Sequence, residues 1–107
     1  MTIDEIETDV EEGKRQRHDL KCVPPYFDAV CRGDKTFEVR RDDRGFQKGD
    51  VLNLREYDRK HGVTEREHFT GNAEQVLVTY VLTGGQFGVE PGHVVMGIKR
   101  LAELEQD

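Results

Sequence analysis

A charged octet in the first half of the chain carries the clearest chemistry in this sequence. Residues 33–40 read GDKTFEVR, so Lys35, Glu38 and Arg40 lie within six positions. An arginine offers forked N–H donors to a phosphate, a lysine offers a mobile positive charge, and a carboxylate accepts hydrogen bonds from a base amino group or a ribose hydroxyl. Arg44 follows four positions later. The pattern predicts a basic concavity that contains one carboxylate.

The residues of the octet also alternate as they would on a β-strand. Thr36, Glu38 and Arg40 share one face, and Glu38 and Arg40 start about 7 Å apart along it. An alternative interpretation is that this face is the solvated side of an amphipathic strand, with one surface ion pair that contributes about 0–1 kcal/mol. The letters GDKT do not make a phosphate-binding loop, because that motif needs an earlier glycine and a following helix, whereas a strand is expected here.

Three further side chains are second-rank candidates for the same cleft. His18 and Lys21 lie on a strand expected before the octet, and Tyr57 ends a strand expected after it. The alternative for His18 is a buried, hydrogen-bonded histidine, and the Tyr57 hydroxyl can equally satisfy a buried neighbour. Phe87, at the tip of a Gly-rich loop over residues 84–92, is either a stacking platform on a lid or a plug for the core.

The cysteines and histidines lack the spacing of metal ligands. Cys22 and Cys31 are nine positions apart and belong to no metal-binding pattern, and the four histidines include no pair four residues apart. We therefore expect reduced thiols, no metal and no cofactor.

The octet needs elements around it that would position its side chains. Apolar residues recur at helical spacing over residues 26–31, and Gly33 is placed to end that helix with a positive φ. Short β-like segments predict six strands, over residues 18–22, 36–41, 51–57, 63–69, 75–82 and 93–101. This order predicts an α+β fold, a small mixed β-barrel with one or two short helices.

Charge divides the chain of 107 residues into a domain and two ends. Residues 1–12 carry six acids and no base, and residues 102–107 carry three acids, which leaves 13 acids against 16 bases between them, a net charge of +3 in a chain of −6 overall. We expect a disordered acidic tail over residues 1–16, one domain over 17–101 and an acidic tail over 102–107. No apolar run is long enough to span a bilayer, so we expect a soluble, cytoplasmic protein with no membrane partner.

The octet resembles the GxKxxExR signature of the ASCH superfamily, whose fold is similar to that of PUA domains. His18-x-Leu20-Lys21 and Gly49-Asp50 also resemble its short phage and bacterial branch, and the resemblance covers about residues 17–101. It implies a β-barrel with a cleft between the octet strand, the early helix and a covering loop. The role proposed for such clefts is recognition of RNA or a modified nucleoside.

One branch of that superfamily, the bacterial N-acetylcytidine amidohydrolases, implies an enzyme. Lys35 matches the lysine that assists removal of the acetyl group, and Glu38 stands where those hydrolases carry a threonine. The catalytic residues of such an enzyme would be Lys35, which the resemblance implies, and Glu38, at which this chain departs from the hydrolase pattern. The chain contains no serine, which excludes a serine nucleophile.

Three functions follow as hypotheses. The first is a module that binds RNA or a nucleotide, in which Lys35, Arg40 and Arg44 hold phosphate and Glu38 selects among bases or hydroxyls. The second is an amidohydrolase that acts on an acylated nucleoside, and the third is a phage or mobile-element scaffold with a protein partner. The full set of candidate binding residues is Lys35, Thr36, Glu38, Arg40, Arg44, Lys21, His18 and Tyr57.

Overall fold

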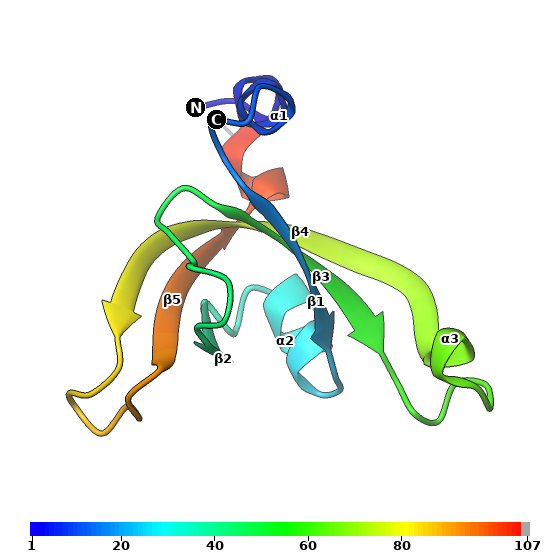
Figure 1. Cartoon of the computed structure of the whole chain (residues 1–107). Coiled ribbons are helices and arrows are strands. Elements are labelled where there is room, and N and C mark those ends of the chain that lie inside the picture. The colour runs from blue at the N-terminus through cyan, green and yellow to red at the C-terminus, as the bar shows by residue number, and fades with distance from the viewer. Residues whose placement is uncertain (106–107) are drawn as a thin grey trace.

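A computed structural model describes residues 1–105 of the chain (Figure 1). Its helices and strands follow one another in the order α1 (Ile3–Glu11), β1 (Arg17–Cys22), α2 (Tyr26–Cys31), β2 (Phe37–Arg41), β3 (Val51–Tyr57), α3 (Glu65–His68), β4 (Phe69–Thr83), β5 (His93–Arg100) and the 3-10 helix η1 (Leu101–Glu105). No helix among residues 1–105 is long and apolar enough to cross a membrane.

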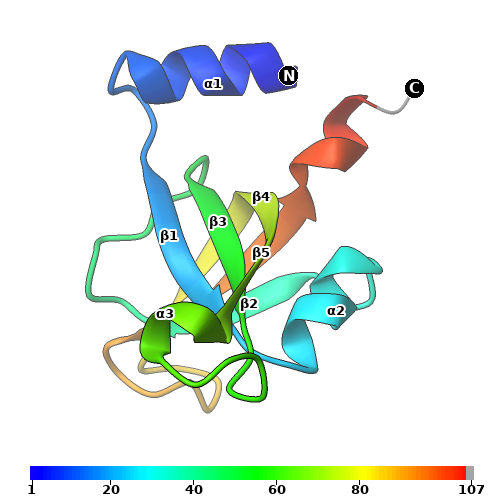
Figure 2. The ribbon, with the colours of Figure 1, turned by 90° about the vertical axis from the view of Figure 1, so that its right-hand side faces the viewer.

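The five strands form one mixed sheet in the order β1-β3-β4-β5-β2. β1 runs parallel to β3, and the other neighbouring pairs are antiparallel. The sheet curls into a half-barrel, with α2 at its open side (Figures 1 and 2). The prediction of an α+β fold with a mixed, barrel-like sheet is confirmed at this level.

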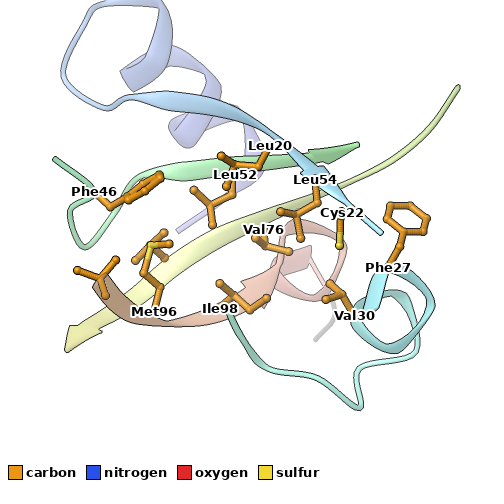
Figure 3. Close-up of a cluster of buried hydrophobic side chains, with 12 residues drawn as sticks. Leu20, Cys22, Phe27, Val30, Phe46, Leu52, Leu54, Val76, Met96 and Ile98 are labelled. Carbon is orange, nitrogen blue, oxygen red and sulfur yellow. The ribbon is translucent and has the colours of Figure 1, made fainter. Parts of the chain in front are cut away.

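The hydrophobic core lies inside the curl. Inward residues alternate along each strand, because successive side chains of a strand point to opposite faces. Phe27 and Val30, on one face of α2, close this core against Cys22 and Leu54 (Figure 3). The shortness of α2 follows from its end at Gly33, whose φ of +82° confirms the expected left-handed position.

The expectation of a disordered tail over residues 1–16 is corrected by α1. Thr2 caps this helix by accepting a hydrogen bond from the Glu5 backbone N–H, and Ile6 is fully buried against Val51 and Leu101. Ile3 and Val10 pack beside this small second core. The apolar residues Ile3, Ile6 and Val10 have helical spacing. The six acids of residues 1–12 obscure this pattern in the sequence.

The acidic C-terminal tail expected over residues 102–107 is also structured at its start. η1 begins at Leu101, which is buried, and Leu104 packs against the same small core as α1. Residues 106–107 lie outside the described part of the chain. The helices α1 and η1 therefore meet at one end of the half-barrel (Figure 1).

The strand predicted over residues 63–69 is wrong. Thr64 and Glu67 form a reciprocal capping box, in which each side chain accepts a hydrogen bond from the other's backbone N–H, and this box starts the short helix α3. The strand expected over 75–82 is longer, because β4 begins at Phe69. In the loop over residues 84–92, Phe87 is 84% exposed, so it does not plug the core.

Candidate functional site

The edge strand β2 turns its polar face inwards. Glu38 is 3% exposed, whereas Phe37 and Val39 are 46% and 51% exposed. Glu38 lies opposite the buried Met96 of β5, so both face the interior of the half-barrel. The interpretation of this face as a solvated strand surface is therefore wrong for Glu38.

The Glu38 carboxylate is held between two cations. Lys35 Nζ donates to Glu38 Oε1 at 2.6 Å, and Arg40 Nε donates to Oε2 at 3.0 Å. Lys35 Nζ also donates to the Phe37 carbonyl oxygen at 2.7 Å. A buried carboxylate is tolerated when such charged donors satisfy it. Lys35, Arg40 and Glu38 together carry one net positive charge, which favours the binding of a further anion.

The turn before β2 places Lys35 at this position. The backbone N–H groups of Asp34 and Lys35 both donate to the Ala29 carbonyl oxygen, which closes the end of α2 around Gly33. Five residues, 32–36, connect the end of the helix to the start of β2. Lys35 therefore lies between the helix and the strand, within reach of the inward face of β2.

Arginine side chains span the gap between the two edge strands. Within residues 1–105, β1 and β2 are not paired with each other. Instead, Arg40 Nη2 donates to the Lys21 carbonyl oxygen at 2.8 Å, and Arg44 Nη1 donates to the Asp19 carbonyl oxygen at 2.9 Å. These bonds satisfy acceptors on the free edge of β1 and leave the remaining N–H groups of both guanidinium groups available.

A hollow of about 530 Å³ opens beside this gap. Two exposed aromatic rings stand at it: Tyr26 from α2 is 53% exposed and Phe37 from β2 is 46% exposed. Lys35 Nζ lies 5.8 Å from the centre of the Tyr26 ring and 5.0 Å from the centre of the Phe37 ring. We call this space the aromatic hollow, and its lining is Lys21, Cys22, Val23, Tyr26, Lys35, Phe37, Glu38, Val39 and Arg40.

A second hollow, of about 360 Å³, adjoins the aromatic hollow at Arg40. It shares Lys21 and Arg40 with the aromatic hollow. Four of its side chains are cationic and only one is acidic. We call it the basic hollow, and its lining is Asp19, Leu20, Lys21, Arg40, Arg44, Arg55 and Phe69.

Of the residues expected at the site, five line these two hollows. Lys35, Glu38, Arg40 and Lys21 line the aromatic hollow, and Arg44 lines the basic hollow. Thr36 is exposed and lines neither.

His18 lies outside the site because it is a buried structural residue. Its Nε2 lies 2.9 Å from Asp50 Oδ2, its ring packs edge-on against Phe46, and 7% of its surface is exposed. The same Asp50 oxygen accepts from the Gln47 backbone N–H. The interpretation of His18 as a buried, hydrogen-bonded histidine is confirmed. The other expectation, that His18 contacts the cleft, is wrong.

Tyr57 also lines neither hollow, but it acts on Lys21 through Glu65. Tyr57 Oη donates to Glu65 Oε2 and Lys21 Nζ donates to Glu65 Oε1, each at 2.6 Å. The bond to Glu65 raises the pKa of Lys21 and that of Tyr57, and the bond from Lys21 is the largest cause that lowers the pKa of Glu65. Lys21 is thereby held as an ammonium with an internal counter-ion.

Cys22 is the one thiol of the aromatic hollow. Burial first, and the nearby negative charge of Glu38 second, raise its pKa to about 11. The group is therefore a neutral thiol near pH 7, which removes it as a nucleophile. Among residues 1–105, no three His, Cys, Asp or Glu side chains gather as ligands for a metal.

The sequence interpretation did not assign to the site the two exposed rings of the aromatic hollow or the stacked pair Arg55 and Phe69 of the basic hollow. Phe37 belongs to the octet but was placed on an apolar face, and Tyr26 was placed on the core face of its helix. Arg55 and Phe69 come together only through the pairing of β3 with β1 and β4. The signal for Phe37 was present, since a carboxylate on the inward face requires the apolar neighbours to point outwards.

Residues 17–98 match the sequence profile of the family described as "Domain of unknown function (DUF3850)". A protein of Escherichia phage P2, described as "Uncharacterized 12.9 kDa protein in GpA 3'region", is 38% identical over 64 residues, which make up 60% of this chain and 52% of that protein. The chain thus spans about half the length of the curated relative that it matches. The family match includes every lining residue of both hollows.

Proposed function

This chain belongs to the DUF3850 family, and we propose that it binds a nucleotide unit, of RNA or free in solution, in the aromatic hollow. The base lies against Tyr26 and Phe37, beside the charge of Lys35, and a phosphate is held at Arg40. We further propose that the family is a branch of the ASCH superfamily with its PUA-like fold. Of the octet residues that carry this resemblance, Lys35, Glu38 and Arg40 line the hollow.

One observation carries the proposal: two exposed aromatic rings and two fixed cations meet at one hollow. Exposed large apolar side chains that gather at a concavity are typical of binding sites. Every base has a π-face, and stacking on an aromatic side chain contributes about 1–3 kcal/mol per base. The cations beside the rings offer the charge that a phosphate needs.

We propose for Glu38 a role other than the selection of bases or hydroxyls. Both of its oxygens already accept from Lys35 and Arg40, and the side chain is 5% exposed. It therefore does not select bases by direct contact. Glu38 is a positioning residue that fixes the ammonium and guanidinium groups relative to the two rings.

The amidohydrolase hypothesis has no comparable support. Lys35 Nζ is engaged with Glu38 and with the Phe37 carbonyl oxygen, which leaves one of its donors free and no lone pair for attack while it is an ammonium. Cys22 is a protonated thiol near pH 7. We therefore propose binding and propose no catalytic step.

The test is a titration with the four ribonucleoside monophosphates and a short single-stranded RNA. Tyr26→Ala and Phe37→Ala are each expected to weaken binding by about 5- to 150-fold, the equivalent of about 1–3 kcal/mol of stacking. Tyr80→Ala is the matched control, because Tyr80 is 64% exposed and lines neither hollow. Absence of binding at millimolar concentrations, or equal effects of all three variants, contradicts the proposal.

A further inference from the structure

The basic hollow is built from three separate segments of the chain. Lys21 on β1 lies opposite Arg55 on β3 in the parallel register, and both side chains are on the exposed face of the sheet. Arg44 reaches the hollow from the loop between β2 and β3, and Arg40 from the edge strand β2. The spacing of residues in the sequence did not predict that Arg55 lies near Lys21, Arg40 and Arg44.

Most of the cations in the basic hollow already have a partner. Lys21 pairs with Glu65 and Arg40 with Glu38. Arg44 donates one bond to the Asp19 carbonyl oxygen and lies 3.7 Å from the exposed Asp43 carboxylate, beyond hydrogen-bond distance.

Arg55 differs from these cations because no carboxylate of residues 1–105 forms an ion pair with it. Its guanidinium carbon lies 4.1 Å from the centre of the Phe69 ring. Stacking on an aromatic ring fixes the plane of a guanidinium group and leaves its N–H edges free. The guanidinium group of Arg55 is therefore fixed in place, and its N–H donors remain available to a ligand.

Little negative charge in the hollow opposes an anion. Among residues 1–105, Asp19 is the only acid in its lining, and Asp19 Oδ1 accepts a hydrogen bond from the Asn53 amide. Arg40 lines both hollows, and its Nη1 donates to no atom of residues 1–105. Because Lys21 and Arg40 line both hollows, the two hollows adjoin, and one ligand can contact both of them at Arg40.

We propose that the basic hollow is the phosphate subsite, in which Arg55 and Arg44 join Arg40 in binding a phosphate on the ribose of the nucleotide whose base lies in the aromatic hollow. The inference rests on the function proposed above and assigns the residues that bind the phosphate of that nucleotide, so a bare nucleoside is expected to bind weakly. The same chemistry is offered by the terminal phosphate of a free nucleotide and by the phosphodiester of a strand.

The test compares ribonucleosides, their 3′- and 5′-monophosphates and dinucleotides on the wild type and two charge-matched variants. Arg55→Gln is expected to weaken binding of phosphate-bearing ligands by about 10-fold and to leave nucleoside binding unchanged. Arg41→Gln is the control, because Arg41 is exposed on β2 and lines neither hollow. A loss confined to dinucleotides identifies a phosphodiester, and a loss with monophosphates identifies a terminal phosphate.

Two outcomes separate this inference from the proposed function. If Arg55→Gln has no greater effect than Arg41→Gln while Tyr26→Ala still weakens binding, the phosphate subsite is overturned and the base site stands. If Arg55→Gln weakens binding while Tyr26→Ala and Phe37→Ala do not, the phosphate subsite stands and the base site is overturned. For a short single-stranded RNA, the Arg55 change should also make the salt slope less steep by about 0.7.

Discussion

At the scale of single residues, Glu38 shows how one buried charge organises the site. Its carboxylate is 3% exposed and joins Lys35, Arg40 and, through them, the two aromatic rings beside the hollow. Burying a charge costs free energy unless the partners are well placed. The arrangement therefore stabilises the protein only while all three groups are present.

We predict that Glu38→Gln lowers the free energy of unfolding by about 2 kcal/mol. This value is below the 3–5 kcal/mol that follows when a fully buried pair is broken, because Lys35 and Arg40 are 17% and 25% exposed and keep some access to water. Urea denaturation measures the change. Asp43→Asn is the control, since that carboxylate is 61% exposed and 3.7 Å from Arg44, and it should alter stability by less than about 0.5 kcal/mol.

A second prediction concerns Cys22 at high pH. Its pKa is raised from 9.0 to about 11 in the folded protein, so folding keeps the proton on the thiol. The resulting stabilisation is fully present below pH 9 and is lost as pH rises from about 9 to about 11, by an amount on the order of 2–3 kcal/mol. Denaturation at pH 7, 9 and 10.5 should show a greater loss for the wild type than for Cys22→Ala. Parallel losses would contradict the assignment.

At the scale of elements, β2 and α1 show what the sequence could and could not reveal. The alternation of the octet predicted β2 and grouped Glu38 with Arg40 correctly, since period 2 depends on the backbone alone. Which face points inwards depends on the neighbouring strand, and here Met96 of β5 places Glu38 inside. The helix α1 was missed because its apolar positions are few and its burial depends on Val51 and Leu101, far along the chain.

We predict that Ile6→Ala lowers the free energy of unfolding by about 2–5 kcal/mol. Ile6 is fully buried between Val51 and Leu101, and truncation of such a side chain removes apolar burial and leaves a cavity. Thr8→Ala, on the exposed side of the same helix, serves as the control with a change within about 0.5 kcal/mol. Equal stabilities of the two variants would restore the interpretation of this segment as a disordered tail.

At the scale of the whole molecule, charge is separated along the half-barrel. The acids of α1 lie at one end, and the helices α2 and α3 lie at the opposite end (Figures 1 and 2). The aromatic hollow is lined by Tyr26 of α2, so it belongs to the second end. The count of charges predicted a mildly basic domain with acidic ends, but the position of those ends depends on the packing of Ile6 and Leu101.

This separation predicts that the acids of α1 act on ligand binding only through the long-range field. The triple variant Asp4→Asn, Glu11→Gln, Glu12→Gln changes the net charge from −6 to −3. At about 0.15 M salt the Debye length is about 8 Å, so we expect affinity for a single-stranded RNA within about twofold of the wild type. At about 0.01 M salt the Debye length is about 30 Å, and the same variant should bind more tightly.

Glu65→Gln is the variant to compare with the triple variant, because Glu65 pairs directly with a residue of the site. Glu65 holds Lys21 Nζ at 2.6 Å, and Lys21 lines both hollows. Loss of this internal counter-ion frees the ammonium group for the ligand, so we expect binding to tighten several-fold at about 0.15 M salt, where the triple variant has no effect. Titrations of the three proteins at both salt concentrations measure this difference. A triple variant that gains as much as Glu65→Gln at the higher salt would place the acids of α1 at the ligand, against the arrangement of the fold.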